Sequence, residues 1–275
     1  MFSSFLDFFN PIKVDTKSSL VLDPAVLKKT IEENRAILRQ IDNWIDEDAF
    51  KNSCFSYGVP DFIKVELNKE LDESPTYTDL MKTIVYKHFA HLSYLEIGVS
   101  VGKNFFQMMQ VQKPASLVGF DIEEINPVLE AAGLTLENSE NWATPAKSIK
   151  KTASSLKEYR YNDRGVSYLC ADVWDEKSWS KLSGQKFNLV FSDALHTPEA
   201  ILFEFEMLVK YSLLADKFVI VWDDLVGKMQ RSFFKIIKRY DKQFGIEDIY
   251  LLNVNGWVGQ YEQAHTVGII SNFKL

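Results

Sequence analysis

The segment that most constrains this chain runs from residue 94 to residue 104, where an apolar stretch ends in an acid and two glycines follow. The acid is Glu96, and the glycines are Gly98 and Gly102. This pattern is typical of a buried strand, a tight turn and the start of a helix. Such a turn lets backbone N–H groups approach a ligand at the positive end of a helix. The segment therefore predicts a sheet covered by helices, with a ligand site at the turn.

From residue 94 onward, short apolar runs alternate with helical patterns. Runs of this kind are typical of parallel strands that helices cover on both faces. Strands are expected at residues 94–97, 117–121, 166–170, 187–192 and 218–222. Helices are expected at residues 103–111, within 145–159, at 198–211 and at 225–244, where Gly245 suits the end of the last helix.

Two further strands are expected at the end of the chain, at residues 249–252 and 266–270. The Asn255-Gly256 dipeptide between them is a hairpin-type turn signal, so this pair is expected to be antiparallel. The sequence thus predicts an α/β fold: a doubly wound, Rossmann-like sheet of seven strands that closes with an antiparallel hairpin.

The first ninety residues have a different pattern. Apolar residues at helical spacing predict helices at residues 24–45 and 78–89, with a loop at 51–63. We expect residues 1–90 to form a helical extension or cap and residues 91–275 to form the Rossmann-like sheet domain. The first nine residues are rich in apolar side chains, which favours docking on the body of the protein or on a second subunit. A homo-oligomer through this N-terminal region is therefore one expected assembly.

Charge and cysteine content exclude several classes of protein. The chain has 275 residues and a net charge of −7, so it repels phosphate backbones and no nucleic-acid partner is expected. Cys54 and Cys170 are too few for a disulfide scaffold or a zinc site. No apolar run is long enough to cross a bilayer, and the N-terminus lacks the features of a signal peptide. The expected location is the cytoplasm, with no integral membrane segment.

Acidic residues stand at the carboxyl end of each of the first five strands. They are Glu96, Asp121, Asp172, Asp193 and the pair Asp223 and Asp224. A single aspartate after a strand is common, because aspartate also caps the next helix. Ligands of doubly wound sheets bind beyond these strand ends, so acids at five of them indicate a binding edge.

These features resemble the class I S-adenosylmethionine-dependent methyltransferases, over roughly residues 90 to 270. The segment from Glu96 through Gly98 to Gly102 resembles the first motif of that family, whose backbone and acidic residue hold the methionine part of the donor. Ser100 stands where many members carry a third glycine. The resemblance implies that Glu96, Gly98, Ser100 and Gly102 contact the donor.

Two further motifs extend the resemblance. Gly119-Phe-Asp121, followed by Ile122, resembles the second motif, and Asp121 would accept hydrogen bonds from the ribose hydroxyls. Cys170-Ala-Asp172-Val173 resembles the third motif, in which Asp172 would accept from the adenine amino group and Val173 would flank the ring. A nicotinamide dehydrogenase is the competing class, but its usual Gly-x-Gly-x-x-Gly spacing is absent here.

The last two strand ends favour a metal ion. If the strand order is the one that the resemblance implies, the fourth and fifth strands are neighbours about 4.8 Å apart, and the carboxylates at their ends converge. Converging carboxylates repel unless a cation or a proton lies between them, and an all-oxygen set favours Mg²⁺, Mn²⁺ or Ca²⁺. The pattern resembles metal-dependent O-methyltransferases that act on sugars and other hydroxylated small molecules, which implies Asp193, Asp223 and Asp224 as the metal ligands.

The resemblance implies methyl transfer to a hydroxyl of a small molecule, with the metal orienting the acceptor and lowering the pKa of its hydroxyl. His196 or Asp193 would take the proton. Each of these residues also has a purely structural interpretation. His196 precedes a helix start at Thr197-Pro198, and an aspartate of the pair could cap the helix at Leu225. His265 is expected to be structural. A metal-independent enzyme and a non-catalytic binding protein remain the alternatives.

Overall fold

A computed structural model describes residues 20–41, 74–143, 153–255 and 264–275. Nine strands form one sheet: β1 (Leu92–Ile97), β2 (Ala115–Asp121), β3 (Thr135–Ala143), β4 (Ala153–Tyr161), β5 (Arg164–Cys170), β6 (Phe187–Ser192), β7 (Leu214–Trp222), β8 (Asp248–Asn255) and β9 (Ala264–Ser271). The helices are α1 (Pro24–Ile41), α3 (Tyr77–His88), α4 (Lys103–Met109), α5 (Pro127–Ala131), α6 (Glu176–Ser180), α7 (Pro198–Lys210) and α8 (Lys228–Phe244).

The strand order across the sheet is β3-β4-β5-β2-β1-β6-β7-β9-β8. The five central strands, β5, β2, β1, β6 and β7, are parallel. At one side, β9 runs antiparallel to β7 and pairs with β8 as an antiparallel hairpin. The predicted doubly wound, Rossmann-like sheet with a closing hairpin is therefore confirmed.

Two strands were not predicted. The structure places β3 and β4 as an antiparallel extension beside β5. The prediction of a helix within residues 145–159 is wrong for its described part, because Ala153–Tyr161 is strand β4. The strand β4 is bonded on both sides by β3 and β5, and such long-range pairing overrides local helical preference.

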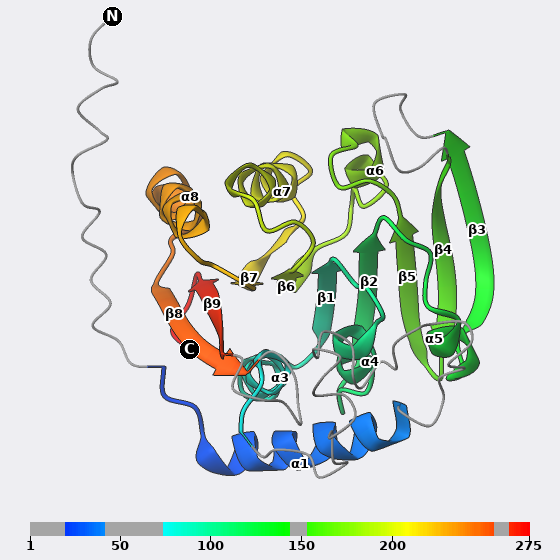
Figure 1. The fold of residues 1–275 in the computed structure, drawn as a ribbon, viewed down its shortest axis with the longest axis horizontal. Helices are drawn as coiled ribbons and strands as arrows, with labels where there is room; N and C mark the ends of the chain where they lie inside the picture. Colours follow the sequence, from blue (N-terminus) through cyan, green and yellow to red (C-terminus); the bar gives the residue numbers. More distant parts are fainter. Residues whose placement is uncertain (1–19, 42–73, 144–152, 256–263) are drawn as a thin grey trace, which may run out of the picture.

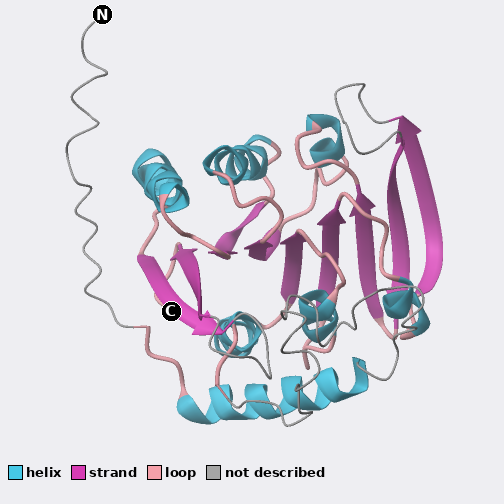
Figure 2. Cartoon of the chain, viewed as in Figure 1, coloured by secondary structure: helices cyan, strands magenta, loops and turns pink. Residues whose placement is uncertain are grey.

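Helices cover the two faces of the sheet in separate sets. Figure 1 shows α6, α7 and α8 on one face and α3, α4 and α5 on the other, with α1 lying across the outer side of the second set. The same arrangement in Figure 2 shows the strands enclosed between the two helical layers. Each side of the sheet has its own apolar core.

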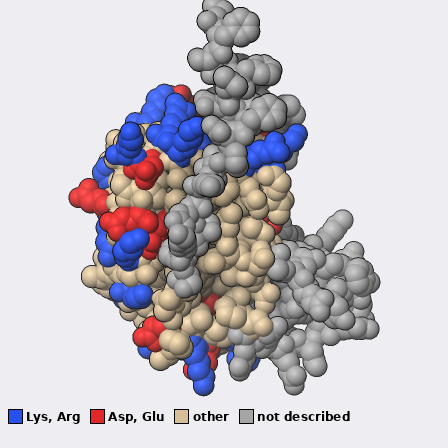
Figure 3. Space-filling model, turned by 90° about the vertical axis from the view of Figure 1, so that its left-hand side faces the viewer, with Lys and Arg blue, Asp and Glu red and all other residues tan. Residues whose placement is uncertain are grey.

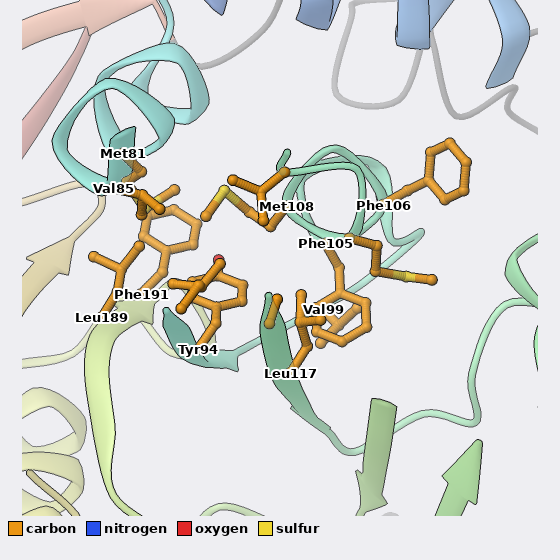
Figure 4. Close-up of a cluster of buried hydrophobic side chains, with 14 of the residues drawn as sticks. Met81, Val85, Tyr94, Val99, Phe105, Phe106, Met108, Leu117, Leu189 and Phe191 are labelled. Atoms are coloured by element: carbon orange, nitrogen blue, oxygen red, sulfur yellow. The ribbon is translucent and has the colours of Figure 1, made fainter. Parts of the chain in front are cut away.

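The core on the α3 and α4 side joins the N-terminal helices to the sheet. Figure 4 shows Met81 and Val85 of α3 beside Met108 of α4, above Tyr94 of β1 and Phe191 of β6. All five side chains are almost completely buried. Helix α3 therefore packs directly on strands whose ends carry the acids. The boundary at residue 90 remains a prediction.

Local signals explain the helix ends near the carboxyl edge. Thr197 caps α7 through its side chain, and Pro198 occupies the first turn, as the sequence predicted. Helix α8 begins at Lys228 rather than at Leu225, and its cap position is Gly227, which makes no side-chain cap. Neither Asp223 nor Asp224 therefore caps this helix. Gly245 ends α8 in the left-handed region, as expected.

Several predicted features fall outside the described residues. They are the apolar first nine residues, the end of the first helix at residues 42–45, the loop at residues 51–63 and the turn residue Gly256.

Candidate functional site

The carboxyl ends of the parallel strands meet along one edge of the sheet. Ile97 of β1 lies beside Ser192 of β6, and Ser192 lies beside Trp222 of β7. The ladder continues one step further, because the amides of Asp193 and Asp223 donate to Ile97 and Ser192 over 2.8 and 3.0 Å. The residues just after β1, β6 and β7 are therefore fixed side by side.

The turn after β1 has the backbone that the glycine pattern indicated. Gly98 and Gly102 have φ values of 88° and 83°, and Ser100 has a φ of 52°. Ser100 thus occupies the left-handed region, at the position where a third glycine is common in the family that the first motif resembles. A Cβ on Gly98 would lie 2.5 Å from the Cα of Ala194 and from the carbonyl oxygen of Asp193. The turn therefore packs directly against the backbone that follows β6.

Asp121 holds this turn in place. Its Oδ2 accepts hydrogen bonds from the amides of Val99 and Ser100, each over 2.7 Å, and its Oδ1 accepts from the amide of Glu123 over 2.9 Å. The residue is buried. A carboxylate offers about four lone-pair directions, so one remains for a ligand hydroxyl at Oδ1. Asp121 therefore links the glycine turn to β2 and can still accept from a ribose.

Glu96 is the centre of a buried hydrogen-bond network. Its Oε2 accepts from the Tyr94 hydroxyl and from Asn104 Nδ2, both over 2.7 Å. The amide oxygen of Asn104 accepts in turn from the Thr78 hydroxyl on α3 over 2.7 Å. Burial raises the pKa of Glu96 well above its usual range, against the lowering effect of these hydrogen bonds. A cationic group placed beside Glu96 would restore the charged form.

The third motif lies at the end of β5, next to β2. Asp172 is half-buried, and its Oδ1 accepts from the amide of Trp174 over 3.0 Å. Val173 is buried, and Ile122, after the neighbouring strand β2, is partly buried. Because β2 and β5 are adjacent and parallel, these residues lie at the same edge as the glycine turn. The structure therefore places together all the residues expected to contact the donor.

At the other half of the edge, carboxylates and imidazoles alternate. His196 Nε2 lies 3.0 Å from Asp193 Oδ1, and its Nδ1 lies 3.3 Å from Asp224 Oδ2. His265 Nδ1 lies 2.8 Å from Asp223 Oδ2 and 3.2 Å from Asp224 Oδ1. Residues that follow β6 and β7 thus meet a histidine from β9. We call these five residues the acid–histidine cluster.

The charges in the acid–histidine cluster shift its titration. Burial raises the pKa of Asp193 to about 6, although the hydrogen bond from His196 opposes that shift. The hydrogen bond to Asp193 raises the pKa of His196. Burial lowers the pKa of His265, but the hydrogen bond and the charge of Asp223 outweigh it and raise the pKa overall. Both imidazoles therefore hold a proton more strongly than a free imidazole does.

Asp223 carries an unsatisfied buried atom. Its side chain is almost fully buried, and its Oδ1 has no hydrogen-bond partner among the described residues. Buried polar atoms are rarely left without a partner, so such an atom needs an explanation. Among the described residues, one oxygen of Asp223, one of Asp224 and one ring nitrogen of His265 lie within 4.8 Å of one another. These three side chains form the compact group that could hold a metal ion, and Asp193 adjoins it through His196.

Sequence reasoning missed His265 as a site residue, because it lies on β9, 42 positions after Asp223. The register of β9 against β7 brings the two together, since Gly268 pairs with Trp222. The only local signal was a histidine at the start of a predicted strand, which is not specific. The antiparallel hairpin therefore contributes a residue to the cluster.

Tyr77 is a second residue that sequence reasoning missed. Its ring lies 5.0 Å from the Phe191 ring and 6.0 Å from the His265 ring, centre to centre. The side chain is buried, and among the described residues none hydrogen-bonds its hydroxyl. Burial raises its pKa well above the usual range, and the charges of Asp193 and Asp223 add to that shift. Tyr77 is therefore a neutral hydroxyl beside the acidic edge, supplied by α3.

Glu204 lies behind the edge, on α7. The Ser192 hydroxyl donates to its Oε2 over 2.6 Å, while its Oε1 is buried and finds no partner in the part of the chain that the structure describes. Burial raises the pKa of Glu204 to about 8, so it is mostly protonated near neutral pH. A neutral Glu204 adds no further negative charge to the region behind Asp193.

The comparisons with known proteins agree with this geometry. Residues 95–225 match a family described as a methyltransferase domain. This match covers the glycine turn and all of the strand-end acids. No curated protein sequence matches the chain.

Solved structures with a similar fold include several methyltransferases. Magnesium protoporphyrin IX methyltransferase (ChlM) from Synechocystis PCC 6803, solved with bound SAM, is 13% identical, with a TM-score of 0.46 over 93% of this chain and 100% of that chain. A putative methyltransferase from Streptococcus mutans, in complex with SAH, is 10% identical, with a TM-score of 0.43 over 70% and 96% of the two chains. MycE methyltransferase of the mycinamycin pathway, in complex with Mg and SAH, is 12% identical, with a TM-score of 0.41; the match covers 72% of this chain and 48% of that chain.

Within the described parts of the chain, every helix is too short or too polar to cross a bilayer.

Proposed function

We propose that this protein transfers the methyl group of S-adenosylmethionine to a hydroxyl of a small molecule, sugar-like or natural-product-like, with the help of a divalent metal ion. One observation carries the proposal. A single sheet edge has the glycine turn with Asp121 at one end and the acid–histidine cluster at the other. The first half suits a nucleoside donor, and the second suits an acceptor that must lose a proton.

The donor half has groups that match each part of S-adenosylmethionine. Glu96 is a buried carboxylate that suits the ammonium of the methionine part. Asp121 keeps one accepting direction for a ribose hydroxyl, and Asp172 keeps an oxygen for the adenine amino group. When bound, the donor supplies a methyl group on a positively charged sulfur. The task of the chain is then to hold the acceptor oxygen in line with that methyl group.

The acceptor half can take up the proton. His196 lies between Asp193 and Asp224, so both ring nitrogens face carboxylates. If a cation engages Asp224, His196 keeps only Asp193, which fixes Nε2 as the donor and leaves Nδ1 able to accept a proton. This is the arrangement in which a carboxylate orients a histidine base. Asp193 would thus orient the base, and His196 would remove the acceptor proton.

The compact group of Asp223, Asp224 and His265 would hold the metal ion. The unsatisfied Oδ1 of Asp223 is the atom that most needs a cation. A bound divalent ion supplies Lewis acidity, which lowers the pKa of a hydroxyl next to it. Imidazole as a third ligand favours Mn²⁺ or another transition metal over Mg²⁺, whereas a set that includes Asp193 in its place favours Mg²⁺.

The donor is tested by calorimetry of the full-length protein with S-adenosylhomocysteine. We expect a single site whose affinity falls about ten-fold or more in Asp121→Ala, because this change removes the anchor of the glycine turn and the ribose acceptor. Asp163→Ala, an exposed aspartate away from the edge, is the control and should bind as wild type. Absence of binding to folded wild-type protein would remove the proposal.

The metal is tested by titrating Mn²⁺ and following it by calorimetry and by electron paramagnetic resonance, without any need for the acceptor. We expect Asp223→Asn and His265→Gln each to weaken Mn²⁺ binding at least ten-fold, because each removes a ligand. Asp172→Asn, at the same edge but outside the acid–histidine cluster, is the matched control. If Mn²⁺ binding were weakened in Asp193→Asn but not in His265→Gln, the metal ligands would be Asp193, Asp223 and Asp224 instead. Methyl transfer that persists in EDTA would favour a metal-independent reaction with His196 as base.

A further inference from the structure

Helix α8 carries a line of positive charge that the proposed reaction does not use. Its lysines and arginines recur at intervals of three and four residues, which places them on one face of a helix. With 3.6 residues per turn, they fall within a sector roughly 80° wide and extend over about 21 Å. We call this set the basic ridge, and its members are Lys228, Arg231, Lys235, Lys238 and Lys242.

The basic ridge points away from the protein. All five of its side chains are exposed, whereas Met229, Phe233 and Ile236 of the same helix are buried against the sheet. Figure 3, which faces the side of the molecule that carries α8 in Figure 1, shows Lys and Arg gathered toward the top of the view. Asp241 is the one acid on α8, and it lies outside the sector. The ridge is therefore a solvent-facing strip of uniform sign.

The charges of the basic ridge are not neutralised by the residues that the structure describes. In the described part of the chain, none of its five residues forms an ion pair. The neighbouring Arg239, outside the ridge, does pair with Glu206 of α7. Five unpaired like charges in one line repel one another, and the chain as a whole has a net charge of −7. Such a concentration of one sign on an acidic protein fits an anionic partner.

We propose that the basic ridge docks the protein on an anionic lipid surface. A straight helix presents its outermost residues to a flat surface, so a membrane can approach all five charges at once. Four of the five are lysines, which act as point charges, whereas arginine is preferred for bidentate contacts with phosphates and bases. No aromatic residue lies in the ridge to stack on a base, which makes a nucleic acid the weaker fit.

An exposed apolar residue lies at one end of the basic ridge. Val226, two residues before α8, is 58% exposed. An aliphatic side chain beside a row of lysines suits the boundary between headgroups and acyl chains. The ridge also begins four residues after Asp224, so docking would hold the acid–histidine cluster close to the lipid surface. The proposal does not depend on the methyl-transfer function.

Co-sedimentation of the full chain with vesicles tests this proposal. The vesicles are phosphatidylcholine with or without phosphatidylglycerol, at low and at high salt. We expect binding only with phosphatidylglycerol and only at low salt, because surface charges are screened within a Debye length. Lys235→Glu/Lys238→Glu should reduce the bound fraction about ten-fold, since each basic residue contributes to attraction by the anionic leaflet.

The controls separate the ridge from net charge and from folding. Lys28→Glu/Lys29→Glu changes two exposed lysines of α1 and gives the same net charge, and it should bind as wild type. Lys235→Gln/Lys238→Gln repeats the test without charge reversal if the first variant unfolds. The proposal would be overturned if the wild-type protein did not bind anionic vesicles, or if the ridge and α1 variants lost vesicle binding equally. Binding to a single-stranded or duplex oligonucleotide in place of vesicles would also overturn it.

Discussion

Gly98→Ala is expected to cost about 2 to 5 kcal/mol of unfolding free energy. Two effects add. A φ of 88° is unfavourable for a residue with a Cβ, by about 1 to 2 kcal/mol. The new Cβ would also lie 2.5 Å from backbone atoms of Asp193 and Ala194, which cannot rotate away, and overpacking of this kind costs about 1 to 3 kcal/mol. Urea denaturation measures the loss.

Gly184→Ala separates the two effects. Gly184 has the same φ of 88°, but no atom lies within 4 Å of a Cβ placed there. This variant should lose only about 1 to 2 kcal/mol, and its binding of S-adenosylhomocysteine should stay close to wild type. Gly98→Ala should also lose that binding, because relief of the clash must move the backbone after β6. Equal stabilities of the two variants would show that the turn does not pack against residues 193 and 194 as described.

The sequence predicted the features of this edge that depend on local pattern. The glycines of the turn and the acids after each strand directly follow, in sequence, the strand that positions them. The positions of Gly98, Asp121 and Asp193 could therefore be predicted. The apolar runs also fixed the parallel strands, because strands buried on both faces have few polar residues. Their common edge then follows from the parallel arrangement.

The remaining features depend on contacts between distant parts of the chain. His265 reaches Asp223 only through the antiparallel register of β9 on β7. The strand β4 forms because β5 and β3 bond it on both sides, although a helix was predicted within residues 145–159. Tyr77 precedes the first strand by fifteen residues and enters the site because α3 packs over β6. Local periodicity carries no information on such pairings.

The position of Tyr77 is set by a buried ion pair between α1 and α3. Asp79 of α3 accepts from Arg35 Nη2 over 2.9 Å and from Asn34 Nδ2 over 2.6 Å. It also accepts from the amide of Thr76 over 2.9 Å, which completes the capping box at the start of α3. Arg35 and Asp79 are both buried. This network fixes the first turn of α3, from which Thr78 extends the hydrogen-bond chain to Asn104 and Glu96.

Asp79→Ala is therefore expected to cost about 3 to 5 kcal/mol, because it removes the carboxylate that balances the buried charge of Arg35. It should also weaken the binding of S-adenosylhomocysteine, since the chain from Thr78 to Glu96 loses its anchor. Glu137→Ala is the matched control, because it removes the carboxylate partner of Arg160 in an exposed pair and should cost less than about 1 kcal/mol. Urea denaturation and calorimetry measure both effects. If Asp79→Ala were as stable as Glu137→Ala and bound the ligand as tightly, the N-terminal helices would not organise the donor site.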